Sequence, residues 1–320
     1  MRVLFLAVIL AAQAPCLYGA ESSSAQFLSL GFGARALGMG EAFTAVADDI
    51  SCVYYNPAGL AEQASGTTWK SGPAGPAGDE VQFSHAWHVQ DTALSQLSYM
   101  ARPYIYSATY FSAGKIEGRN ADQTLSGDFT AQDLALGVSR GFMLGPVMAG
   151  ITGKIISQRI KTSGATSFAA DLGLLYRFEG SPYSVGASLA NLGTKVKFED
   201  ESFPLPLRLR IGAAAAFKER KLLLALDGEF PNDAPEAVRL GAEYRGIESL
   251  ALRLGYRTVT GRQHDAVTGG GFGDGAGGVD GLYGFYAGLG FSYGKFPLDY
   301  ALLPYGDLGS AHRFSLGMSF

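Results

Sequence analysis

A two-residue alternation of side chains runs through most of the chain from residue 79 onward. Residues 313–320 show it clearly, because every second residue is Phe, Leu or Met and the residues between are Arg, Ser or Gly. Successive side chains of a strand point to opposite faces, so this period predicts β-strands with one apolar face. We expect fourteen strands, over residues 79–88, 92–101, 103–113, 128–141, 146–160, 165–178, 182–191, 205–218, 221–230, 235–245, 248–259, 279–293, 295–303 and 310–320.

The connections between these segments differ in length in a regular way. Those after even-numbered segments are tight, whereas several after odd-numbered ones are long: 114–127, 192–204, 260–278 and 304–309. An even strand count, short turns on one rim and long loops on the other are typical of an outer-membrane β-barrel, with both chain ends on the periplasmic side. A soluble β-sandwich is the alternative, but its second face would be polar, and here that face is mostly Gly, Ala and Ser.

Composition and the first residues narrow the class of protein further. The chain is 47% hydrophobic and 17% charged with a net charge of −4, which argues against disorder and against nucleic acid as a partner. Met1 and Arg2 precede an apolar run over residues 3–12, which predicts a signal peptide over residues 1–20. The mature chain would keep one cysteine, Cys52, and therefore no internal disulfide. Export combined with alternating strands predicts a closed barrel in the outer membrane of a Gram-negative-type bacterium, with membrane lipid around it.

The segment between the signal peptide and the first strand does not alternate. It is rich in small residues and contains an Asp pair and an Asn-Pro turn, which predicts short helices and tight bends. We expect it to fold inside the barrel as a plug, which we call the hatch, so that the domains are 1–20, 21–78 and 79–320. The candidate hatch residues are Gly38, Gly40, Asp48, Asp49, Asn56, Pro57, Ala58 and Gly59. A periplasmic docking arm for secretion partners is the alternative for this segment.

If the apolar rows face lipid, the opposite rows line the lumen. They place charged side chains on neighbouring strands: Arg208, Arg210, Asp227, Glu229, Arg239, Glu243, Arg253 and Arg257. Charges are costly on the lipid face but tolerated inside a barrel. We interpret them as an ion network that stiffens the wall and holds the hatch, with a selectivity filter as the alternative. At the C-terminus, Phe320 is the candidate signal by which barrel-assembly machinery recognises the chain.

Two regions make the sequence similar to a known family. The run GARALGMGEAFTAVADDISCVYYNPAGLA, residues 33–61, resembles the N-terminal motif of the PorV/PorQ family, whose members are distant relatives of the FadL transporters. Residues 298–320 and 133–141 resemble other parts of the same family. The resemblance implies a fourteen-stranded FadL-like barrel whose hatch is anchored by Asn56, Pro57 and Ala58. It also implies either assistance in type IX protein secretion, with secretion-system components or exported proteins as partners, or passage of a hydrophobic ligand.

An enzyme is the rival class, because some outer-membrane barrels are hydrolases with a histidine base. The four histidines are His85, His88, His264 and His312, and none has an evident serine partner in the sequence. His85 and His88 are three residues apart and would point to opposite faces of a strand, so they cannot share a metal ion. We expect no catalytic function, no metal and no cofactor.

Overall fold

A computed structural model describes residues 23–65, 79–87, 92–119, 124–218, 220–258, 282–305 and 309–320. The predicted signal peptide, the end of the predicted hatch over residues 66–78, His88, His264 and the loop 260–278 lie outside the described residues.

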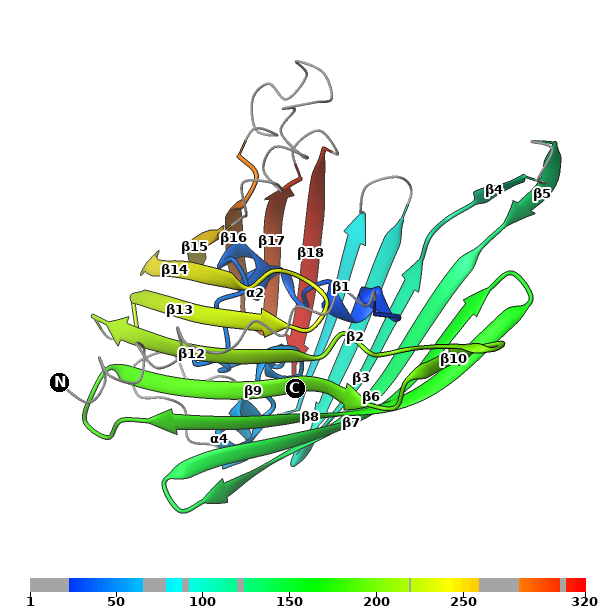
Figure 1. Ribbon diagram of the computed structural model, residues 1–320. Coiled ribbons are helices and arrows are strands. Elements are labelled where there is room, and N and C mark those ends of the chain that lie inside the picture. Colours follow the sequence, from blue (N-terminus) through cyan, green and yellow to red (C-terminus); the bar gives the residue numbers. More distant parts are fainter. Residues whose placement is uncertain are drawn as a thin grey trace.

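The described chain forms a closed antiparallel barrel around a helical segment (Figure 1). The barrel strands are β1 (Glu80–Trp87), β2 (Ala93–Ala101), β3 (Tyr104–Ser112), β6 (Ala131–Leu144), β7 (Val147–Ile160), β8 (Ser163–Arg177), β9 (Tyr183–Gly193), β12 (Arg208–Phe217), β13 (Leu222–Pro231), β14 (Ala237–Ile247), β15 (Leu250–Arg257), β16 (Phe285–Tyr293), β17 (Phe296–Pro304) and β18 (Ser310–Ser319). Strand β1 pairs with β2 and also with β18, and this pairing closes the barrel.

The fold class predicted from the alternation is confirmed, because each of the fourteen predicted segments overlaps one barrel strand. Several predicted boundaries were wrong, and two of them have a clear local reason. Strand β16 begins at Phe285 because residues 283–284 form a turn, in which Gly284 has a φ of 91°. Strand β6 begins at Ala131 because residues 125–129 belong to a separate hairpin strand.

Two predicted loops contain hairpins that extend beyond the barrel wall (Figure 1). The first hairpin joins β4 (Ile116–Arg119) to β5 (Leu125–Phe129), and the second joins β10 (Val196–Phe198) to β11 (Glu201–Phe203). Alternation over three to five residues is too short to distinguish from a loop in the sequence. We call this end of the barrel the loop rim, and the end with the tight turns and residues 80 and 319 the terminal rim.

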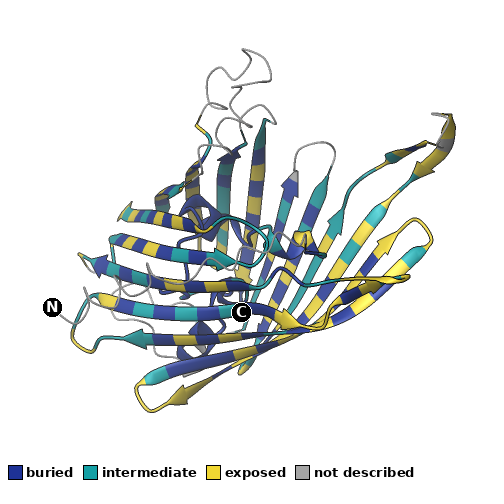
Figure 2. Cartoon of the chain, viewed as in Figure 1, coloured by how far each residue is buried: buried dark blue, intermediate teal, exposed yellow. Residues whose placement is uncertain are grey.

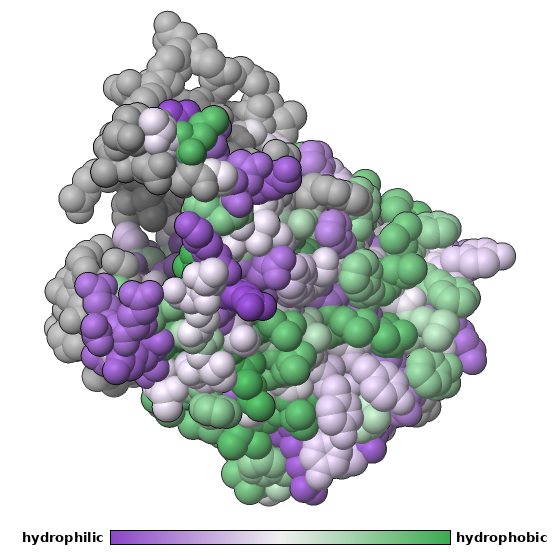
Figure 3. Space-filling model, turned by 90° about the vertical axis from the view of Figure 1, so that its right-hand side faces the viewer, coloured by the Kyte–Doolittle hydropathy of each residue, from purple (hydrophilic) through white to green (hydrophobic). Residues whose placement is uncertain are grey.

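The two faces of the wall differ as the alternation predicts. Buried and exposed residues alternate along the strands (Figure 2), and in β18 Phe314, Leu316 and Met318 are exposed while Arg313 and Ser315 are buried. Exposed apolar side chains cover the outside of most strands, and hydrophobic residues occupy much of the lower half of the face in Figure 3. An apolar belt of this kind is the surface that a barrel presents to lipid.

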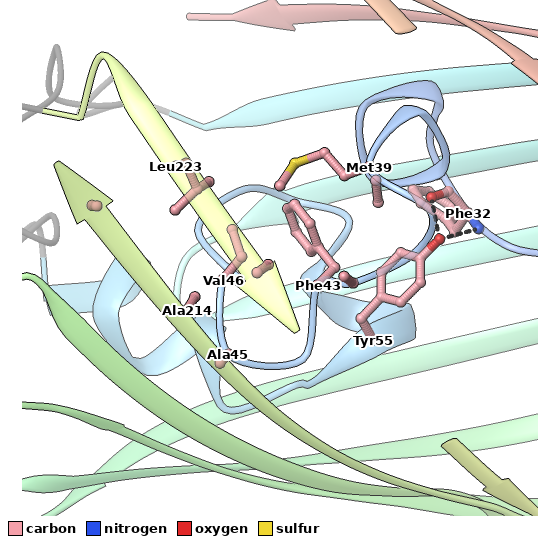
Figure 4. Close-up of a cluster of buried hydrophobic side chains, with 12 residues drawn as sticks. Phe32, Met39, Phe43, Ala45, Val46, Tyr55, Ala214 and Leu223 are labelled. Atoms are coloured by element: carbon pink, nitrogen blue, oxygen red, sulfur yellow. Dashed lines mark hydrogen bonds between the residues drawn. The ribbon is translucent and has the colours of Figure 1, made fainter. Parts of the chain in front are cut away.

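Inside the ring of strands lies the hatch, which the structure describes over residues 23–65 (Figure 1). Its elements are the 3-10 turn η1 (Gln26–Ser29) and the short helices α2 (Ala34–Gly38), α3 (Cys52–Tyr55) and α4 (Gly59–Ser65). Phe43 and Val46 of the hatch pack beside Ala214 and Leu223 of the wall (Figure 4). No helix among the described residues has the length and apolar character needed to cross a bilayer.

Candidate functional site: the hatch and the inner wall

Asn56 ties the hatch to itself and to the wall. It follows α3, where its backbone is extended, and its side chain is fully buried. Its Nδ2 donates to the carbonyl oxygen of Thr44 at 2.8 Å and to that of Leu174 on β8 at 2.9 Å. Its Oδ1 accepts from the amide of Ala58 at 3.1 Å, across Pro57. One side chain therefore satisfies three buried backbone groups, two in the hatch and one in the wall.

Glycines in the wall let the hatch backbone come close. A Cβ on Gly173 would lie 2.1 Å from Asn56 Oδ1, and one on Gly255 would lie 2.0 Å from the nitrogen of Gly40. Further glycines that meet hatch atoms in this way are Gly141, Gly150, Gly186, Gly241 and Gly288. Any larger residue at these positions would displace either the hatch or the strand. The glycine-rich inner rows thus form a smooth surface against which residues 38–61 lie.

The predicted hatch glycines take part in the same contacts. Gly38 lies against Gly288, where an added Cβ would be 2.9 Å from the Gly288 Cα. Gly40 has a φ of 64°, a backbone conformation that favours glycine, and a Cβ there would meet Leu240 O at 2.8 Å. A Cβ on Gly59 would lie 2.0 Å from Ala47 O within the hatch.

Glu229 on β13 is the centre of a first buried charge cluster. It accepts from Arg210 at 2.8 Å, from Arg208 at 3.1 Å and from Arg239 at 3.0 Å. Arg239 also binds Glu41 of the hatch at 2.9 Å. The guanidinium of Arg210 also lies over the ring of Tyr54, 5.2 Å from its centroid. Buried charges persist when they are paired and hydrogen-bonded, and this cluster joins three wall strands to the hatch.

Glu243 on β14 is the centre of a second cluster. It accepts from Arg253 at 2.7 Å and from Arg35 of the hatch at 2.9 Å. Arg35 in turn binds Asp48 and Asp49, each at 2.7 Å, so the predicted aspartate pair is held by a hatch arginine. Removing one partner of such a buried group leaves an uncompensated charge, which is strongly destabilising.

Asp48 also contacts Arg220, which follows β12 at the terminal rim. Burial alone would raise the pKa of the Asp48 carboxyl, but the guanidiniums of Arg35 and Arg220 outweigh it and hold that pKa below its usual range. Asp48 therefore remains ionised in the closed hatch, where it joins the Arg35 cluster to the rim of the barrel.

Two more side chains of the wall bind the hatch backbone. Asp227, which is fully buried, accepts from the amides of Phe43 at 2.9 Å and Thr44 at 2.8 Å. Arg177 donates to the carbonyl oxygens of Ala45 and Val46, each at 2.8 Å, and forms an ion pair with Glu62 at 2.7 Å. Consecutive hatch residues 43–46 are thus held by backbone contacts to the wall.

The structure brings together seven of the eight predicted lumen charges in these contacts, all from inward-facing positions. Asp227 lies opposite Arg239 in register, yet it accepts hydrogen bonds from hatch amides. The expected lateral pairing of charges therefore holds for Glu229 and Glu243 but not for Asp227. Arg257 lies opposite Arg239, and among the described residues its Nε has no hydrogen-bond partner.

Several members of the site were missed in the sequence. Arg35, Glu41 and Glu62 supply the hatch side of the ion pairs, and Arg177 and Asp299 complete the wall side. Asp299 binds Arg253 at 2.6 Å. A signal was present for the wall residues, because Arg177 and Asp299 both occupy inward positions of predicted strands.

The inner wall at β1, β2 and β18 holds the hatch differently. One hydrogen bond joins the Ala34 amide to Ser315 at 2.8 Å, and a long one joins Gln96 to the Gly31 carbonyl at 3.4 Å. Among the described residues, buried polar atoms here lack a hydrogen-bond partner: Gln82 Oε1, Ser84 Oγ, Gln96 Oε1, Ser98 Oγ, and Nε and Nη1 of Arg313. The ion pairs between the wall strands and the hatch lie elsewhere, at Arg177 on β8 and at Arg239 and Glu243 on β14.

Phe198 links a groove at the loop rim to the buried apolar cluster of the hatch. A groove of about 760 Å³ lies between the hairpins, and its lining is mixed: Phe129, Ile160, Phe198 and Phe203 are apolar, whereas Glu117, Arg119, Lys161, Thr162 and Ser163 are charged or polar. Phe198 also packs against the buried cluster that contains Phe27 and Leu28 of the hatch. Beside these two residues lies a cavity of about 40 Å³, which also touches Lys154 and Asp171. This cavity has room for water but not for a ligand of ordinary size.

Two predictions outside the hatch concern His85 and Phe320. The expectation that His85 lacks a serine partner was wrong, because strand pairing sets Ser95 beside it and the two side chains lie 3.0 Å apart. The His85 ring stacks on outward-facing Phe83, and we assign no catalytic role to this contact. Phe320 is 53% exposed and stacks on Tyr99, and its role as an assembly signal stays a prediction.

The geometry defines a class of protein: a transmembrane β-barrel whose lumen is closed by an N-terminal hatch. No protein-family model and no curated protein matches the sequence. Among solved structures, the Ralstonia pickettii toluene transporter TbuX superposes with a TM-score of 0.56 at 13% identity, over 91% of this chain and 98% of that chain. A deltaS2 mutant of the monoaromatic hydrocarbon channel TodX gives 0.52 at 12% identity, over 91% and 99%. A FadL homologue of Pseudomonas aeruginosa gives 0.46 at 10% identity, over 94% and 98%.

At these identities the likeness to TbuX and TodX is one of fold. The chain shares the barrel fold of these two proteins. The proteins with this fold are described as a transporter and a channel.

Proposed function

We propose that the protein is a passive outer-membrane channel for hydrophobic small molecules, with residues 23–65 as its gate. The observation that carries the proposal is the apolar contact by which Phe198 of the loop-rim groove packs against the buried cluster that contains Phe27 and Leu28 of the hatch. A toluene transporter and a monoaromatic hydrocarbon channel with the same fold support this class of substrate.

The attachments of the hatch explain how such a gate works. Among the described residues, each consists of ion pairs, hydrogen bonds and close contacts, and none is a covalent bond or a strand of the barrel sheet. The hatch can therefore move without breaking the wall. The hatch separates first from the inner wall at β1, β2 and β18, because few polar contacts join them there. The buried polar groups of this wall that lack a hydrogen-bond partner can also bind water when the hatch moves away.

Uptake of a hydrophobic fluorescent probe into liposomes that contain the mature protein tests the proposal. Phe198→Glu puts a charge into this apolar contact and should lower the rate of uptake at least ten-fold. Lys197→Glu is the matched control, since it places a carboxylate on the neighbouring exposed position of the same hairpin. Equal uptake by protein-free liposomes, or equal rates for both variants, would overturn the proposal.

Assistance in protein export of the PorV/PorQ type is the second candidate. The observation that favours it is the resemblance of residues 33–61 and 298–320 to that family, since these residues form the hatch and the closing strands. Secretion-system components or exported proteins would then be the partners. Pull-down of the intact protein from outer membranes, followed by mass spectrometry, distinguishes the two: stable capture of secretion components favours export.

A further inference from the structure

A long apolar trough crosses the outside of the barrel. It has a volume of about 820 Å³ and runs from Tyr183 on β9 to Leu302 on β17. One row of outward residues forms its floor, and these residues are direct partners in the strand registers: Tyr183, Ala215, Leu224, Ala242, Leu254, Ala287 and Leu302. The row climbs from near the terminal rim at Ala215 to near the loop rim at Leu302.

Small side chains make this part of the wall thin. Alanines alternate with leucines along the floor, so every second position lacks the bulk that would fill the trough. The inward neighbours on the same strands are also small, and they include Ala214, Ala225, Gly241 and Gly255. The hatch backbone lies directly behind Gly241 and Gly255, so the trough and the hatch touch opposite sides of the same backbone layer.

The shape of the trough selects an elongated apolar occupant. Its floor crosses seven strands, and at about 4.8 Å between neighbouring strands its length is about 29 Å. It opens on the lipid-facing side, where Leu224 is 42% exposed and Leu254 is 68% exposed. An empty apolar groove lacks dispersion contacts along its whole lining, so a molecule that fills it is bound favourably. In a bilayer, the molecule available to fill it is a lipid acyl chain.

The terminal-rim end of the trough offers positive charge. Tyr183 packs edge to face against Phe217 at 6.4 Å, and Phe217 leads into the turn Lys218-Glu219-Arg220-Lys221. Arg220 binds Asp48, whereas Lys218 and Lys221 are exposed. The turns on either side carry the acidic residues Glu179 and Glu248. With Arg220 paired to Asp48, Lys218 and Lys221 against Glu219 leave this turn with one net positive charge, which an anionic head group at this end of the trough would meet.

We propose that the trough binds an acyl chain of an anionic phospholipid from the periplasmic leaflet, with the lipid phosphate beside Lys218 and Lys221. The tyrosine at its entrance lies at the level where aromatic rings face lipid head groups. The site is separate from the route through the lumen, and it does not depend on what the channel carries.

Native mass spectrometry of the full-length protein, released from nanodiscs of equal parts phosphatidylglycerol and phosphatidylethanolamine, tests the proposal. The wild type should retain one phosphatidylglycerol in preference to phosphatidylethanolamine. Ala242→Phe fills the floor between Leu224 and Leu254 and should lower the retained fraction at least ten-fold. Ala108→Phe is the matched control, because Ala108 faces outward between Leu97 and Leu136 but lies outside the trough.

A second variant tests the head group separately. Lys218→Gln with Lys221→Gln should lower the preference for phosphatidylglycerol about five-fold for each lysine removed. Both positions lie in a turn outside the wall, so this variant should assemble and still tests lipid binding if Ala242→Phe does not assemble. Equal retention of the two lipids by the wild type, retention of an uncharged molecule instead, or unchanged lipid binding by the lysine variant would overturn the proposal.

Discussion

Replacing Asn56 with Leu should loosen the closed hatch while leaving the barrel assembled. The substitution keeps a side chain of similar size at a fully buried position. It removes the bonds to Thr44 O, Leu174 O and Ala58 N, and none of these three backbone groups gains a new partner from leucine. When the hatch is displaced, water can form hydrogen bonds with the same groups. The substitution therefore destabilises the closed state and not the open one.

The size of the effect follows from the three bonds. A net contribution of about 1 kcal/mol for each gives a loss of about 3 kcal/mol. Since 1.4 kcal/mol corresponds to a factor of ten, the ratio of open to closed hatch should rise about 100-fold. The outer face is unchanged, so insertion into membranes should be normal.

Planar-bilayer conductance and uptake of a hydrophobic probe measure the change. Asn191→Leu is the control, because Asn191 is a buried amide on β9 that donates to Pro206 O, in the segment before β12, rather than to the hatch. It should lower the unfolding temperature without raising permeability. If Asn56→Leu inserts normally and its permeability equals that of the wild type, the hatch is not a gate.

Three further substitutions test separate parts of the structure. Gly255→Val should reduce the yield of folded, heat-modifiable barrel or release the hatch, because its Cβ would lie 2.0 Å from Gly40 N. Gly153→Val is the control and should leave that yield unchanged, because a Cβ at Gly153 would have no atom within 4 Å. Asp227→Arg leaves the amides of Phe43 and Thr44 without their acceptor and adds a positive charge beside Arg239, so the unfolding temperature should fall by several degrees. Asp128→Arg, at an exposed position, should show almost no change in unfolding temperature. Deleting Phe320 should lower the amount of assembled protein in the outer membrane, and unchanged assembly would refute its role as a signal.

The barrel could be predicted from the sequence because each strand carries its own period. The inward and outward rows follow from that period, and so do the inward positions of Glu229, Glu243 and Arg253. Neither the strand registers nor the depth of the outer trough is visible in a single segment, since both arise from pairing with neighbours. The hairpins at the loop rim were too short to show a period.

The partners of the hatch could not be predicted. Its helices have seven residues or fewer, so no repeating face identifies which side meets the wall. Arg35 and Glu243 are 208 positions apart in the chain, and Asn56 and Leu174 are 118 apart. Sequence reasoning named Asn56 as a turn residue, but its bond to β8 depends on Gly173, whose lack of a side chain makes room for the asparagine.

The central claim is that the hatch closes the lumen and moves when a hydrophobic molecule passes. Cys52 reports on this directly, because it lies in α3 of the hatch and is fully buried. The measurement is the rate at which a membrane-impermeant thiol reagent labels Cys52 in liposomes that contain the mature protein. The account predicts slow labelling that rises at least ten-fold when a permeating hydrophobic probe is added. Rapid labelling without the probe, or a rate that stays unchanged while the probe passes through, would contradict it.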